Sequence, residues 1–134
     1  MRSARVLALL ALCAGVHAQD RELQRVPVSR EHDPLYLDPA SVLRSGTRVS
    51  FRYVLDVPVA FDVPGRPRRW RSNEAAAVID CARNTFSIEK VVAYAGPAGS
   101  GEVVGRHSGN AAEREPAPIA ADSTFDFLAR YLCK

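Results

Sequence analysis

One short stretch of this sequence carries a high density of positive charge. Four arginines lie around the only tryptophan, and the residues are Arg66, Arg68, Arg69, Trp70 and Arg71. Guanidinium groups at this spacing repel one another unless an anion is near, and arginine binds carboxylates, sulfates and phosphates through paired hydrogen bonds. The stretch therefore predicts a docking loop for an acidic protein, a glycan sulfate or an anionic lipid head group, with Trp70 as a stacking anchor.

A structural interpretation of the same stretch is also open. In that case Trp70 begins the next strand and packs on a sheet, while the arginines are only solvated. Nucleic acid is the least favoured partner, because one short loop gives weak, salt-sensitive binding. We expect a protein partner and no nucleic acid.

Residue types that serve catalysis occur here without the spacing that catalysis needs. Gly96–Gly101 has the glycines of a phosphate-binding loop, but Glu102 stands where a lysine is required, so a turn between strands is favoured. Outside the N-terminal 18 residues, His32 and His107 are the imidazoles, and neither belongs to a recognisable catalytic spacing. We expect no catalytic residues.

Acidic residues around His32 raise the alternative of a metal site. Glu31, Asp33 and Asp38 supply ligand types, but Pro34 intervenes and no two of them share a helical or strand face. A solvated polar loop is favoured, and we expect neither a metal nor a cofactor.

The first 18 residues have the features of a secretory signal peptide. A basic start precedes the apolar run 6–12, and residues 16–18 place small side chains where signal peptidase recognises them. Cleavage after Ala18 would leave one domain, residues 19–134. The full sequence has a formal charge of +3, and removal of residues 1–18 removes Arg2 and Arg5, so the domain has a formal charge of +1.

A lipid anchor is the alternative to soluble export. Cys13 would carry it, but Leu12 is bulky where the residue before a lipidated cysteine is small, so soluble export is favoured.

Removal of Cys13 with the signal peptide leaves Cys81 and Cys133, and an even pair of cysteines in an exported chain predicts a disulfide. A metal pair or a reactive thiol is less favoured, because the two cysteines lack a close-spaced motif and a neighbouring histidine.

The hydrophobic pattern predicts an α+β domain with an antiparallel sheet and a terminal helix strapped to one face. Residues 47–57 alternate apolar and polar side chains, which is typical of a half-buried strand. Runs 75–81 and 86–94 continue this period and are joined by a short hairpin turn. Residues 102–104 suit a short strand, and residues 123–132 a helix with one apolar stripe.

Smaller features follow from local chemistry. Asp38–Ser41 is predicted to form one helical turn, because Pro39 suits the first helical position. Residues 62–73 and 106–122 have the composition of loops. Alternation places Cys81 on the buried face, and on the third strand it places four side chains on one face: Phe86, Ile88, Val92 and Tyr94.

A series of short motifs runs through nearly the whole predicted domain. The motifs are Tyr36-Leu37-Asp38-Pro39-Ala40-Ser41, Arg44-Ser45-Gly46, Ile79-Asp80-Cys81, Tyr94-Ala95-Gly96 with Gly101-Glu102-Val103-Val104, and a cysteine near the C-terminus. The series resembles the bacterial surface-adhesin protein E family over about residues 23 to 133. The resemblance implies a single antiparallel sheet of about six strands, whose concave face holds the C-terminal helix through a disulfide. It also implies binding of extracellular host proteins such as vitronectin and laminin.

These observations predict an exported, non-catalytic binding domain, located in the periplasm or at the cell surface. The first hypothesis is adhesion to an extracellular host or matrix protein. The alternative is a periplasmic accessory protein that contacts another component of the cell envelope. The longest apolar run is too short to span a bilayer, so we expect no transmembrane segment in the mature chain.

The exported protein should begin at Gln19 and carry no acyl chain, because residues 16–18 suit signal peptidase and Leu12 disfavours lipidation. Intact mass spectrometry of the exported protein measures this directly. A mass that fits a diacylglycerol-modified chain starting at Cys13 would contradict the prediction.

Overall fold

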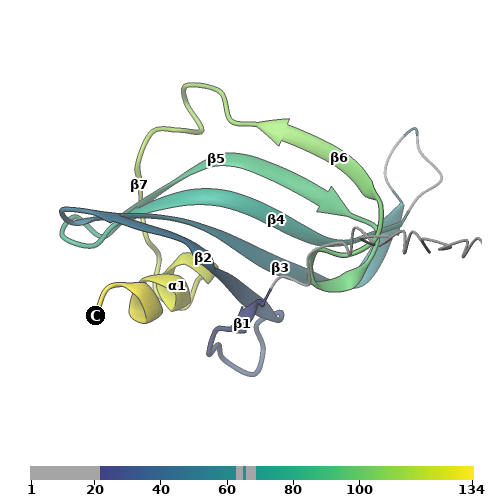
Figure 1. Ribbon diagram of the computed structural model, residues 1–134, viewed down its shortest axis with the longest axis horizontal. Helices are drawn as coiled ribbons and strands as arrows, with labels where there is room; N and C mark the ends of the chain where they lie inside the picture. Colours follow the sequence, from purple (N-terminus) through teal and green to yellow (C-terminus); the bar gives the residue numbers. More distant parts are fainter. Residues whose placement is uncertain (1–21, 63–64, 66–68) are drawn as a thin grey trace, which may run out of the picture.

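The computed structural model describes residues 22–62, 65 and 69–134, and within them the chain forms one curved antiparallel sheet and one helix (Figure 1). The strands follow the order β1-β2-β3-β4-β5-β6, and β7 pairs with β5. The elements are β1 (Gln24–Arg25), β2 (Leu35–Ser45), β3 (Arg48–Asp62), β4 (Arg69–Asp80), β5 (Thr85–Tyr94), the 3₁₀ turn η1 (Pro97–Gly99), β6 (Val103–Ser108), β7 (Ala117–Pro118) and α1 (Thr124–Leu132). The predicted fold class is confirmed.

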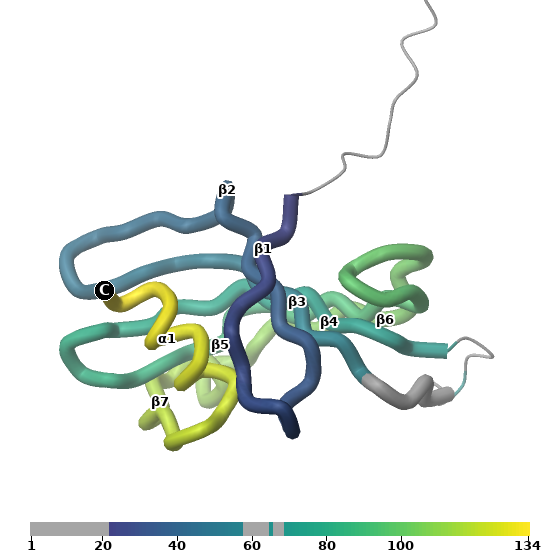
Figure 2. The backbone as a smooth tube through the Cα atoms, turned by 90° about the horizontal axis from the view of Figure 1, so that it is seen from below, coloured from purple at the N-terminus to yellow at the C-terminus, as the bar shows by residue number. Residues whose placement is uncertain are grey.

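The core lies between the concave face of the sheet and α1 (Figures 1 and 2). Val49, Phe51 and Tyr53 alternate onto this face from β3, as the sequence predicts, and are buried. On β4 their neighbours include the small residues Ala75 and Ala77, which are opposite Tyr53 and Phe51 in register. Short side chains at the centre of a curved sheet leave room for bulky residues from a helix.

Helix α1 docks through one apolar face and is fixed at both ends. Ser123 caps its first turn, and the buried residues are Phe125, Phe127, Leu128, Ala129 and Leu132. At the other end Cys133 forms a disulfide with Cys81, with 5.6 Å between the Cα atoms. Arg44 Nη1 also donates to the carbonyl of Leu132 (2.8 Å), one of the helix-terminal carbonyls that lack an intrahelical partner. The predicted strap between helix and sheet is confirmed.

The predicted helical turn at Asp38–Ser41 is wrong, because β2 continues through it with a bulge between Asp38 and Leu43. Asp38 Oδ1 accepts the amide of Ala40 (3.2 Å), and the Ser41 hydroxyl donates to the Asp38 carbonyl (2.6 Å). Ser41 Oγ also accepts the amide of Arg52 on β3 (2.7 Å). These side-chain bonds satisfy backbone groups that a bulge leaves unpaired, so the strand persists through the proline.

The predicted loops are shorter than their composition indicates. Strand β3 extends to Asp62 and β4 begins at Arg69, with Phe61 opposite Trp70 in register. The short strand predicted at residues 102–104 is longer in the structure, where β6 spans Val103–Ser108 because it pairs with β5 along this whole length. Cross-strand pairing, which local composition does not report, extends these strands.

The prediction of which β5 side chains share one face of the sheet is correct only for the first half of the strand. Ile88 lies opposite Ala77, but Lys90 lies opposite Ala76, so Glu89 is an extra residue in the ladder. The bulge reverses the alternation beyond it, and Val91 rather than Val92 packs against the concave core.

Replacing Cys133 with serine should lower the free energy of unfolding by about 4 kcal/mol, because the disulfide closes a long loop of the unfolded chain. The bridged cysteines are 52 positions apart in the sequence. Urea unfolding measures the loss, and the double variant Cys81→Ser/Cys133→Ser should lose as much. A single variant as stable as the parent would contradict a structural role for the disulfide.

Candidate binding surface

The described part of the arginine-rich stretch, Arg69–Arg71, forms the beginning of β4 and not a loop. Arg69 and Arg71 are exposed, while Trp70 is half-buried. The Trp70 indole Nε1 donates to Asn73 Oδ1 (2.7 Å) and to the Ser72 carbonyl (3.1 Å). This arrangement agrees with the structural interpretation of Trp70, which holds the strand end while the arginines point into solvent. Arg66 and Arg68 lie outside the described residues.

The two exposed arginines differ from several others in their surroundings. Arg52 Nη2 lies 2.9 Å from Asp38 Oδ2, and Arg130 Nη2 lies 2.8 Å from Asp126 Oδ2. Neither Arg69 nor Arg71 forms an ion pair with a residue that the structure describes. The positive charge of Arg69 and Arg71 is therefore available to a partner.

The glycine-rich turn packs on the convex face of the sheet and binds this chain's own side chains. Ser72, fully buried, donates from Oγ to the Gly96 carbonyl (2.7 Å) and accepts the Gly99 amide (2.9 Å). Asp56 Oδ1 accepts the Ala98 amide (2.7 Å). Gly99 has a φ of 71°, which side-chain-bearing residues rarely adopt. Since these amides already have acceptors, the turn is structural and is not a phosphate-binding loop.

His32 connects the segment after β1 to the helix. Its Nε2 lies 2.8 Å from Thr124 Oγ1, its Nδ1 lies 2.8 Å from the Asp33 carbonyl, and its ring contacts Phe127 edge-on at 5.0 Å. Asp38, a predicted neighbour of His32, instead pairs with Arg52. Within residues 22–62, 65 and 69–134, no group of three or more His, Cys, Asp or Glu side chains is placed to hold a metal ion.

His107 lies on the exposed end of β6 and contacts the following loop. Its Nε2 is 2.7 Å from Glu113 Oε2. This hydrogen bond lowers the pKa of Glu113, and a further bond from the Asn110 amide acts in the same direction. The pair fixes a surface turn.

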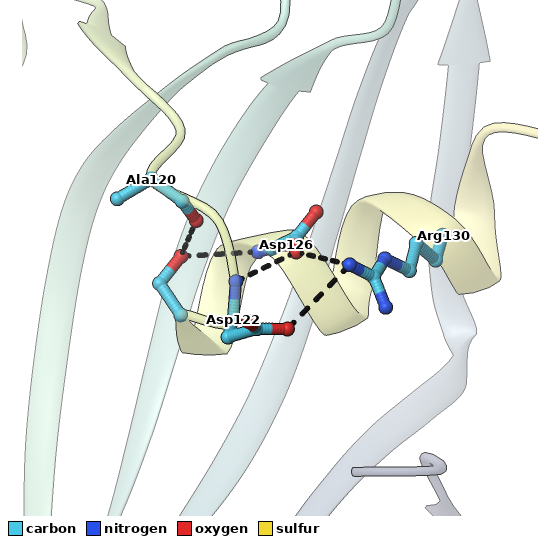
Figure 3. Close-up of polar contacts among 5 residues, drawn as sticks. Ala120, Asp122, Asp126 and Arg130 are labelled. Atoms are coloured by element: carbon cyan, nitrogen blue, oxygen red, sulfur yellow. Dashed lines mark hydrogen bonds and ion pairs between the residues drawn. The ribbon is translucent and has the colours of Figure 1, made fainter. Parts of the chain in front are cut away.

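A polar network fixes the start of α1 (Figure 3). Asp126 Oδ2 accepts the Asp122 amide (2.8 Å) and pairs with Arg130, which also lies 3.6 Å from Asp122 Oδ1. The Ser123 hydroxyl donates to the Ala120 carbonyl (2.6 Å) and accepts the Asp126 amide (3.3 Å). The negative charge of a carboxylate in the first turn interacts favourably with the positive end of the helix dipole, so this network stabilises the helix start.

With this geometry in view, comparison with known proteins identifies the class. A family model described as "Surface-adhesin protein E" matches residues 23–134, and the chain belongs to this family. Membership in a surface-adhesin family places the protein among exported or cell-surface proteins. No curated protein sequence matches the chain at a significant level.

Solved structures of Haemophilus influenzae protein E share the fold. One has a TM-score of 0.62 at 19% identity and covers 83% of each chain. A second, from non-typeable H. influenzae, has a TM-score of 0.61 at 18% identity and covers 81% of this chain and 74% of its own. At these identities the likeness shows the fold alone. In the part of the chain that the structure describes, no helix is long and apolar enough to cross a membrane.

Replacing Arg66, Arg68, Arg69 and Arg71 together with serine should change the melting temperature by only about 3 °C. Arg69 and Arg71 are exposed, the sequence predicts a loop at Arg66 and Arg68, and substitutions at such positions have small effects on stability. Trp70→Ala is the matched control and should lower it by about 5 °C or more, since Trp70 is half-buried and hydrogen-bonded. Thermal unfolding followed by circular dichroism compares the two. A large drop in the serine variant would show that the arginines are structural.

Proposed function

We propose that this domain is a non-catalytic adhesin module that binds an extracellular host or matrix protein. Family membership supports the adhesin class. Both histidines of the predicted mature chain make contacts that hold loops, since His32 connects to Thr124 and His107 to Glu113.

The beginning of β4 is the surface that we propose for the contact. The observation that carries it is the exposed charge of Arg69 and Arg71, which have no ion-pair partner among the described residues. Positive charge on one surface steers an acidic partner to it and favours the correct orientation. Trp70, held by Asn73, gives the arginines a fixed support, so less side-chain ordering is needed on binding. The expected partner surface is acidic.

The test measures binding of the purified domain to immobilised vitronectin and laminin. Arg69→Ser/Arg71→Ser should weaken binding roughly fivefold, as expected for the loss of two solvent-exposed ion pairs. Added salt should weaken binding by the parent and affect the variant less. Arg48→Ser/Arg106→Ser is the matched control, since both residues are exposed on other parts of the sheet.

Two outcomes would contradict the proposal. Equal losses in the two double variants would show that the effect is one of net charge and not of this surface. Absence of binding by the folded parent to both proteins would remove the support for host-protein adhesion.

The alternative is an accessory role inside the cell envelope, and the edge of the sheet favours it. Within the described residues β6 pairs with β5 only, so its outer edge can accept a strand from another envelope protein. Location separates the two functions. External protease should cleave a surface adhesin on intact cells, whereas an accessory protein should be protected until the outer membrane is breached.

A further inference from the structure

A pocket of about 400 Å³ opens between the concave face of the sheet and the start of α1. Its walls come from Tyr53 and Leu55 of β3, Phe86 of β5, Pro118 of β7, and Thr124 and Phe125 of α1. In Figure 1 the chain passes from β7 beneath the arch of the sheet into the helix. This volume lies within the range of small-molecule sites, which is about 300 to 1,000 Å³.

The walls are flat, apolar and fixed. The rings of Phe86 and Phe125 stack with centroids 3.9 Å apart, and Tyr53 meets Phe125 edge-on at 5.5 Å. Among the described residues, no charged side chain lines the pocket. A charged ligand would lose part of its hydration there without gaining a partner of opposite charge, so the pocket favours a neutral ligand, and the aromatic walls favour a flat ring.

The polar groups of the lining are already engaged, with one exception. Ser123 Oγ serves the helix cap, and Thr124 Oγ1 bonds to His32. Tyr53 is 7% exposed, and its hydroxyl has no hydrogen-bond partner among the described residues. In that part of the chain, every fully buried side-chain polar atom has a hydrogen-bond partner. Because the Tyr53 hydroxyl has none, it is not fully buried, and Tyr53 lines the pocket.

We propose that this pocket binds a small neutral aromatic molecule that presents one hydrogen-bond acceptor to the Tyr53 hydroxyl. Burial raises the pKa of Tyr53 to about 12, so the phenol keeps its proton and donates at physiological pH. The aromatic ring of the ligand would lie against Phe86 and Phe125. This function is independent of protein binding at Arg69–Arg71, because none of those residues lines the pocket.

The test compares two probes of similar shape, acetophenone and ethylbenzene, of which only the first carries an acceptor. Titrations followed by amide NMR shifts should place both probes beside Leu55, Phe86 and Thr124. Acetophenone should bind about fivefold more tightly, the typical effect of one neutral hydrogen bond. Tyr53→Phe should remove this preference and leave ethylbenzene binding unchanged.

Tyr94→Phe is the matched control, because Tyr94 is opposite Ser72 in register and does not line the pocket. It should leave the preference intact. Shifts that map to another surface, no binding of either probe at millimolar concentration, or a preference that survives in Tyr53→Phe would each overturn the proposal. The comparison of the two probes on the parent protein tests it even if the Tyr53 variant does not fold. None of these results affects the vitronectin and laminin measurements.

Discussion

The docking of α1 onto the concave face is the interaction on which the rest of the structure depends. A nine-residue helix is too short to be stable alone in water, so tertiary contacts must hold it. The sheet supplies them through an apolar face with small residues at its centre, Ala75 and Ala77. The disulfide to Cys81 and the bond from Arg44 fix the C-terminal end, while the Asp126 network fixes the start. Sheet and helix therefore stabilise each other.

A single sheet has two faces, and each needs a cover. The helix covers part of the concave face (Figure 2), and the turn around η1 folds over part of the convex face, where Val54 and Ser72 are buried. The first turn of α1 lies beside Tyr53, and residues of both line the pocket. The element that covers one face thus forms one wall of the pocket.

The sequence predicts the parts of this fold that depend on regular alternation. Residues of β3 repeat every second position over a long run, and the parity that buries Val49 and Phe51 also brings Cys81 to the helix side. The bulge at Glu89 is not predictable in this way, since it is defined by the register against β4. The helical turn predicted from Pro39 is wrong for a related reason. Side-chain hydrogen bonds within a bulge of β2, and not the bonds of a helix, satisfy the backbone groups around Pro39.

The candidate surfaces show the same limit. The density of arginines is visible in the sequence, but the strand position of Trp70 depends on cross-strand pairing with Phe61, which composition hides. Alternation likewise places Tyr53 on the buried face, but it does not reveal that the Tyr53 hydroxyl has no hydrogen-bond partner within residues 22–62, 65 and 69–134. A phenylalanine would fill the same core position without exposing a polar group to the pocket. The hydroxyl is therefore the group that would distinguish the proposed ligand from an apolar molecule of the same shape.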